Sequence, residues 1–141
     1  MIAVKSLEIH VSYHCNLSCK GCSHMTPLEK EKFIDENDIY DKLKILSKCL
    51  HCEVIRLIGG EPTLNKNLAD IAKNIKKINI ADKIAIATNG IFIDRLNDEV
   101  LKNIDVFEIS NYHYSDYLTN KIINWAKTAK EKYNIKTYIY M

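Results

Sequence analysis

Apolar residues alternate with polar ones in some stretches of the chain and recur every three or four residues in others. Residues 7–13 alternate in the manner of a strand, whereas residues 35–50 place Ile39, Leu43 and Leu46 on one helical face. The same two periods predict four more strands and three more helices, in strict alternation along the chain. These strands are residues 53–58, 82–88, 104–110 and 135–141, and these helices are residues 65–78, 93–104 and 115–133.

This alternation predicts the fold class. A strand, helix, strand order implies parallel strands joined by right-handed helical crossovers, and therefore an α/β fold. We expect a partial, TIM-like (βα) barrel of about four and a half βα units in one domain, residues 1–141. The chain ends inside its fifth strand, so we expect the domain to be incomplete at its C-terminus, or a partner to pair with that edge strand.

The composition of the chain excludes some classes of function. The chain has 141 residues, 47% of them hydrophobic, which is enough for one core. Twenty basic and eighteen acidic residues give a formal net charge of +2, without a basic block, so nucleic acid is not an expected partner. No apolar run approaches the roughly 20 residues that span a bilayer. We expect a cytoplasmic protein that has no contact with membranes.

Five cysteines are present, and three of them, Cys15, Cys19 and Cys22, lie in the short segment CNLSCKGC. This crowding fits metal binding in a reducing compartment better than a disulfide framework. A structural zinc site takes four ligands, whereas a site with three protein ligands keeps one coordination position open for chemistry. A zinc site completed by His14 or His24 is the alternative.

The cysteine segment follows the first predicted strand, and further short motifs follow the next three strands. They are GGEP at residues 59–62, TNG at residues 88–90 and SNYHY at residues 110–114. Carboxyl ends of parallel strands meet at one rim, where α/β proteins gather their binding loops. The glycines of GGEP allow close backbone approach to a ligand, and its proline fixes the turn before the next helix.

A CxxxCxxC loop after the first strand, with GGEP after the second, resembles the radical S-adenosylmethionine (radical SAM) superfamily. The resemblance covers nearly the whole chain. It implies a 4Fe-4S cluster held by Cys15, Cys19 and Cys22, whose fourth iron binds S-adenosylmethionine (SAM). It also implies reductive cleavage of SAM to a 5'-deoxyadenosyl radical that abstracts hydrogen from a substrate.

The resemblance further implies SAM contacts at the strand ends. In the family the GGEP segment binds the methionine amino group, which points to Gly59, Gly60 and Glu61. Similar enzymes place polar groups near the cofactor at the third and fourth strand ends. These positions are occupied by Thr88, Asn89, Ser110 and Asn111. An ordinary turn at TNG and helix N-capping by the last pair are the alternatives.

Some positions depart from the family or stay open. Gly21 stands where the family usually has an aromatic residue near the adenine, so adenine packing would have to come from a backbone contact or from Tyr13 or Tyr112. His113 could face the substrate or simply be a packed or surface residue.

A second group of thiols lies outside the motif loop. Cys49 and Cys52 are predicted on one face at the end of the first helix, with His51 between them. They do not complete a second metal site, so we interpret them as buried or incidental thiols.

The resemblance leaves the substrate open. We expect a small molecule, bound partly by segments beyond this chain, and an external electron donor such as flavodoxin or ferredoxin. One alternative is a compact activase that generates a glycyl radical on a partner protein, although residues 22–30 do not resemble the usual activase sequence. The other alternative is a non-catalytic cluster- or zinc-binding fragment.

Overall fold

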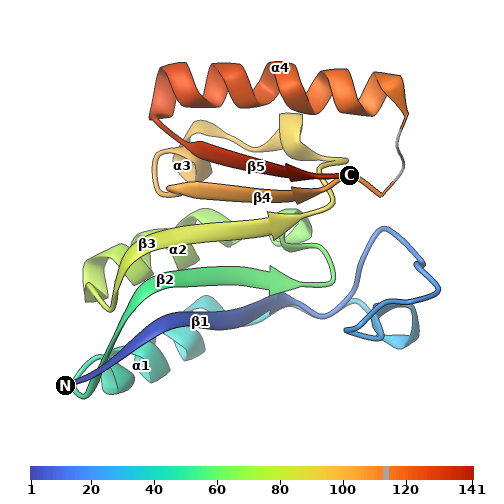
Figure 1. Cartoon of the computed structure of the whole chain (residues 1–141). Coiled ribbons are helices and arrows are strands. Elements are labelled where there is room, and N and C mark those ends of the chain that lie inside the picture. Colours follow the sequence, from blue (N-terminus) through green and yellow to red (C-terminus); the bar gives the residue numbers. More distant parts are fainter. Residues whose placement is uncertain (113–114) are drawn as a thin grey trace.

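The computed structural model describes residues 1–112 and 115–141, and within them five parallel strands form one open sheet (Figure 1). The strands lie in sequence order, β1-β2-β3-β4-β5. They are β1 (Ile2–Ser12), β2 (Leu50–Gly59), β3 (Ala81–Thr88), β4 (Val106–Ser110) and β5 (Lys136–Tyr140). The α/β class and the all-parallel strands predicted from the sequence are confirmed.

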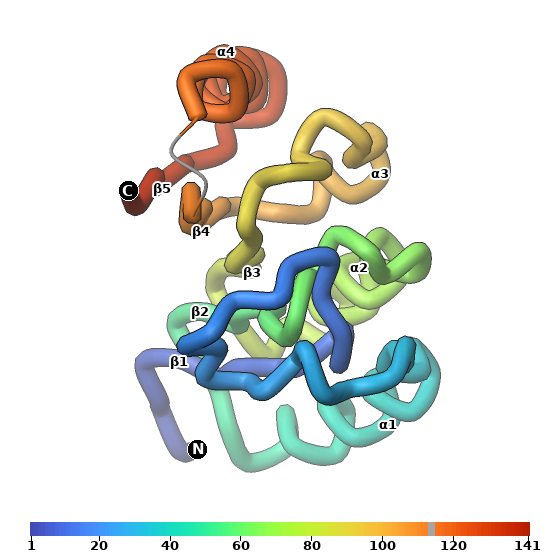
Figure 2. Tube along the Cα trace, turned by 90° about the vertical axis from the view of Figure 1, so that its right-hand side faces the viewer, coloured from blue at the N-terminus to red at the C-terminus, as the bar shows by residue number. Residues whose placement is uncertain are grey.

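Helices connect successive strands. They are α1 (Glu36–Leu46), α2 (Leu68–Ile78), α3 (Asp98–Leu101) and α4 (Asp116–Tyr133), with short 3-10 turns at Thr26–Leu28, Pro62–Leu64 and Ile93–Arg95. Figure 2 shows α1, α2 and α3 along one face of the sheet, with α4 beyond β4 and β5. Side-chain caps begin three of these helices: Asp35 for α1, Asn97 for α3 and Ser115 for α4.

The core lies between the sheet and its helices. Alternate residues of the strands, among them Ile55, Leu57 and Phe107, are fully buried there. Helix α2 contributes Ile71 and Ile75, which are equally inaccessible to solvent. The opposite face of the sheet, which we call the inner face, carries Arg56 and Glu108 among its side chains. No helix of the described residues covers this face in Figures 1 and 2.

Three predicted helices are shorter than expected. Helix α2 begins at Leu68 rather than residue 65. Helix α1 ends at Leu46 rather than residue 50, because residues 47–49 turn and Leu50 opens β2. The helix predicted at residues 93–104 is divided, because Leu96 has extended backbone angles and the Asn97 side chain accepts a hydrogen bond from Val100 N that starts α3 anew. Local turns and capping hydrogen bonds, rather than the spacing of apolar residues, therefore set where these helices begin and end.

Because α1 is shorter than predicted, the prediction that Cys49 and Cys52 share a helical face is wrong. Cys49 lies in the turn and is exposed, whereas Cys52 lies on β2 and is fully buried. They share no helical face, and His51 pairs instead with Asp82 at 2.9 Å. The interpretation that these thiols form no second metal site is unchanged.

Candidate functional site

The loop between β1 and α1 carries the three cysteines and is tied down at both ends. Tyr13 N donates to Lys32 O at 2.9 Å, and Ile34 N donates to Val11 O at 3.3 Å. The segment therefore leaves the end of β1 and returns beside it. Figure 1 shows this loop at the end of the sheet to which the strand arrows point. This is the rim at which the sequence predicted the site.

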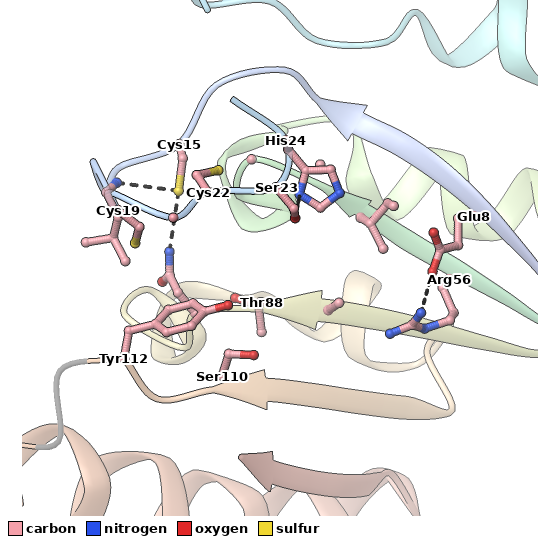
Figure 3. A pocket seen from close by; sticks show the side chains of 17 residues that line it. Glu8, Cys15, Cys19, Cys22, Ser23, His24, Arg56, Thr88, Ser110 and Tyr112 are labelled. Atoms are coloured by element: carbon pink, nitrogen blue, oxygen red, sulfur yellow. Dashed lines mark hydrogen bonds and ion pairs between the residues drawn. The ribbon is translucent and has the colours of Figure 1, made fainter. Parts of the chain in front are cut away.

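Cys15, Cys19 and Cys22 line one pocket of about 320 Å³ (Figure 3). The Cys15 thiol accepts hydrogen bonds from Leu17 N at 3.4 Å and Asn89 Nδ2 at 3.8 Å. Such donors stabilise a thiolate that binds iron. Burial nevertheless raises the pKa of Cys15 above its usual value, whereas the hydrogen bond to the Thr26 hydroxyl lowers the pKa of Cys22.

The donor set fits a cluster with three protein ligands. Three thiols from one loop face one cavity, and soft thiolates are the ligands of iron-sulfur clusters. His24 lines the same pocket, but His14 does not; its ring packs against Phe33. Among residues 1–112 and 115–141, no three His, Cys, Asp or Glu side chains are already grouped at metal-binding positions.

The two glycines of GGEP allow the cysteine loop to lie against the end of β2. A Cβ atom on Gly59 would stand 2.1 Å from Ser12 O, and one on Gly60 would stand 2.0 Å from His14 O. Gly59 also has φ of 141°, a conformation that favours glycine. Both glycines line the pocket, so they shape its wall as well as the loop beside it.

Glu61 is fully buried and does not line the pocket. Its carboxylate accepts hydrogen bonds from Thr63 N and Thr63 Oγ1, at 3.1 and 2.6 Å. It also accepts from Thr88 Oγ1 at 2.6 Å and Asn89 N at 2.9 Å. Glu61 therefore fastens the end of β2 to the end of β3, which brings two of the predicted motifs together.

Thr88 and Asn89 line the pocket beside the cysteines. Thr88 Oγ1 accepts from Gly90 N at 3.1 Å, as in a local turn, while it donates to Glu61. The Asn89 amide donates to Asn16 Oδ1 at 2.8 Å and to the Cys15 thiol. The TNG segment is thus a turn and also a direct neighbour of the cysteine loop.

The two candidate residues at the end of β4 differ in whether they line the pocket. Ser110 lines the pocket, whereas Asn111 is buried and donates from Nδ2 to Thr119 Oγ1 of α4 at 2.7 Å. Neither residue caps a helix, because Ser115 caps α4. Asn111 therefore lies outside the pocket lining.

The aromatic candidates are placed differently. Tyr112 lines the pocket and is 59% exposed, while Tyr13 does not line it and lies below the Lys32 ammonium. Gly21 lines the pocket, and a Cβ atom added to it would have no other group within 4 Å. His113 lies outside the described residues.

Sequence reasoning missed four polar residues near the site. Asn16 bonds to Asn89, and Glu8, Arg56 and Glu108 form an ion cluster on the inner face. These last three lie on one face of the parallel strands, where other polar residues such as His10 and Ser110 also stand. Because strands covered on both faces read as continuous apolar runs, such polar positions signal an open face.

The sequence and the structure both resemble known proteins. The radical SAM superfamily model matches residues 9–137. A GTP 3',8-cyclase of Aquifex aeolicus is 34% identical over 132 residues, which cover 86% of this chain and 40% of that protein. A probable GTP 3',8-cyclase of Thermoplasma volcanium is 35% identical over 115 residues, covering 80% and 34%.

Two solved structures share the fold. BtrN in complex with AdoMet and 2-DOIA superposes with a TM-score of 0.64 and 20% identity, over 95% of this chain and 56% of BtrN. Native anSMEcpe with bound AdoMet and Cp18Cys peptide gives a TM-score of 0.65 at 20% identity, over 98% of this chain and 42% of anSMEcpe.

The chain belongs to the radical SAM superfamily, as the match over nearly its whole length shows. Members of this family use a 4Fe-4S cluster and SAM. The chain spans about 40% or less of the length of the cyclases it matches. No helix in the described part of the chain is long and apolar enough to cross a membrane.

Proposed function

We propose that this chain forms the SAM-cleaving core of a radical enzyme that acts on a small molecule. The observation that carries the proposal is the pocket in which the cysteine loop meets the ends of β2, β3 and β4. When bound there, the cluster and SAM supply a 5'-deoxyadenosyl radical, formed with methionine by one-electron cleavage of the sulfonium, for abstraction of a substrate hydrogen atom.

Cys15, Cys19 and Cys22 are the proposed iron ligands. The amide of Asn89 and the hydroxyl of Thr26 direct hydrogen-bonding groups at two of these sulfurs, which orients them, and the Thr26 hydrogen bond lowers the pKa of Cys22. All five cysteines of the chain are free thiols. The proposal therefore requires a reducing compartment such as the cytoplasm and an electron donor of the ferredoxin or flavodoxin type.

Gly59, Gly60, Thr88, Asn89 and Ser110 are the proposed SAM-binding residues. They line the pocket from three adjacent strand ends, and the glycines leave backbone accessible to a polar ligand. Glu61 and Asn111 are buried behind this wall. Their proposed part in cofactor binding is to hold the pocket wall in place. Glu61 does so through its hydrogen bonds with Thr88 and Asn89, and Asn111 through its hydrogen bond with Thr119.

The test is electron paramagnetic resonance of the anaerobically reconstituted, reduced protein. About four iron and four sulfide per chain are expected, with a 4Fe-4S signal that changes when SAM is added, because SAM enters the coordination position that three thiolates leave open. Binding of one zinc ion without iron uptake would overturn the proposal. A cluster signal that does not change when SAM is added would show that the protein binds a cluster but does not bring SAM to it.

A further inference from the structure

An ion cluster lies at the opposite end of the pocket from the thiols. Figure 3 shows the Arg56 guanidinium beside Glu8, with the three cysteines gathered at the other end. The Arg56 Nη1 atom donates to Glu8 Oε1, and Nη2 donates to Glu108 Oε2. Arg56 Nε donates to the same Glu108 oxygen at 3.1 Å. We call Glu8, Arg56 and Glu108 the inner-face cluster.

The sheet is built so that this cluster can form. Arg56 of β2 and Glu108 of β4 are separated by β3, which presents Ala85 and Ala87 on that face. Arg56 pairs in register with Ala85, and Glu108 pairs with Ala87. Because a methyl group is the whole side chain at both positions, the guanidinium can extend across β3 to a strand that is not its neighbour.

Stability alone gives little reason for this arrangement. The side chains of Glu8, Arg56 and Glu108 are 47%, 32% and 22% exposed. Ion pairs this accessible to water contribute little to the free energy of unfolding. The cluster stands instead on the face that no helix of the described residues covers, and Glu8 and Arg56 line the pocket itself.

The cluster has an excess of hydrogen-bond acceptors and of negative charge. Two carboxylates and one guanidinium leave a net charge of about −1 at neutral pH. Glu8 Oε2 and Glu108 Oε1 accept no hydrogen bond from the residues that the structure describes. Two of the five guanidinium N–H groups also stay available, because three already donate to the glutamates.

Resting on the proposed function, we propose that the inner-face cluster is the substrate subsite and binds the amino group and neighbouring hydroxyls of a polyhydroxylated amine. An ammonium group donates to the two unpaired carboxylate oxygens and neutralises the excess charge. A hydroxyl beside it accepts from the remaining guanidinium N–H groups and donates to a carboxylate. A phosphate at this place meets two carboxylates and is repelled.

The experiment titrates three probes into the reconstituted, SAM-loaded protein and follows binding by saturation-transfer NMR. The probes are glucosamine, glucose and glucose 6-phosphate, which share one ring and differ in charge. Glucosamine is expected to bind roughly tenfold more tightly than glucose, as a charge-assisted hydrogen bond provides, and glucose 6-phosphate is expected to bind least. Glu8→Gln is expected to remove the preference for the amine.

Glu99→Gln is the matched control. It removes the same charge from an accessible ion pair, with Lys73 at 2.7 Å, on residues that do not line the pocket. Its probe preference should equal that of the unaltered protein. Equal binding of the three probes, preference for the phosphate, absence of binding at millimolar concentrations, or an unchanged preference in Glu8→Gln would each overturn the proposal.

Iron content and SAM binding are measured on the same samples. This separates the two proposals, because a protein that binds iron and SAM but shows no preference for the amine contradicts only the subsite. A protein that prefers the amine but takes up no iron contradicts only the proposed radical chemistry.

Discussion

Single thiols should have unequal effects on iron binding, because only three of them line the pocket. Cys19→Ala is expected to abolish stable incorporation of about four iron per chain, since two remaining thiolates hold a cluster poorly. Cys49→Ala is the control, because Cys49 is exposed in the turn before β2. Iron and sulfide analysis after anaerobic reconstitution makes the comparison. Equal iron in both variants would exclude Cys19 as a ligand.

Glu61 should matter for folding before it matters for chemistry. Its buried carboxylate accepts four hydrogen bonds, and in Glu61→Gln one oxygen becomes an NH2 group that cannot accept any. We expect the free energy of unfolding to fall by about 1–3 kcal/mol, the cost of leaving buried donors unpaired. Urea denaturation measures it, with the exposed Glu53→Gln as the control.

An unchanged denaturation midpoint in Glu61→Gln would show that the hydrogen bonds between β2 and β3 are replaceable. In that case the carboxylate would have to be sought as a direct ligand of the cofactor.

The junction between the cysteine loop and the end of β2 depends on Gly60. The Cβ atom in Gly60→Ala would meet His14 O at 2.0 Å, so the loop or the strand end must move. We expect iron incorporation to fall severalfold, because the loop that carries Cys15 is displaced. Gly21→Ala, in the same loop with nothing within 4 Å of its added Cβ, should incorporate iron normally.

This expectation differs from the one that the motif alone suggests. From the sequence, the GGEP glycines were predicted to admit a ligand, and a change there should spare the cluster and weaken only SAM binding. In the structure, the group that comes closest to Gly60 is the backbone of the cysteine loop at His14. A Gly60→Ala protein with full iron content and weaker SAM binding would favour the simpler prediction.

The carboxyl ends of the strands could be predicted from the sequence to within one residue, whereas their starts could not: β1 begins at Ile2 rather than residue 7, and β2 at Leu50 rather than residue 53. All four motifs were placed at the carboxyl ends of strands, because parallel strands are apolar runs followed directly by polar turns. Helix α1 and the segment around α3 were predicted too long, because the apolar period continues through Leu50 and Leu96 while caps and turns divide it. Such turns depend on backbone angles, and the spacing of apolar residues along the sequence carries no information about those angles.

For the whole molecule, the strand order explains which site residues could be foreseen. Alternation along the chain places the ends of β1 to β4 side by side, and the structure indeed gathers the cysteines, both glycines, Thr88, Asn89 and Ser110 around one pocket. The inner-face cluster escaped prediction because Arg56 and Glu108 are joined across β3. A contact between strands that are not neighbours leaves no local pattern in the sequence.

The edge strand β5 should make this chain self-associate. Tyr138 and Tyr140 are 41% and 56% exposed on a strand with one unpaired side. Residues 137–140 of β5 are uncharged, and two of them are aromatic. Such edges pair readily with other chains, so we expect an apparent mass above 16.3 kDa by light scattering, rising with concentration. Tyr138→Lys should lower it, whereas Tyr117→Lys on α4, 80% exposed, should not. A monodisperse monomer at all concentrations would show that the edge is tolerated.

Release of 5'-deoxyadenosine shows directly whether this chain cleaves SAM, because it requires the cluster, SAM and their contact in one pocket. The reconstituted protein is reduced with dithionite in the presence of SAM, and the nucleoside is quantified by mass spectrometry beside a Cys19→Ala sample. We expect 5'-deoxyadenosine and methionine in equal amounts from the unaltered protein and neither from the variant. Bound iron without 5'-deoxyadenosine above the level of Cys19→Ala would contradict this expectation.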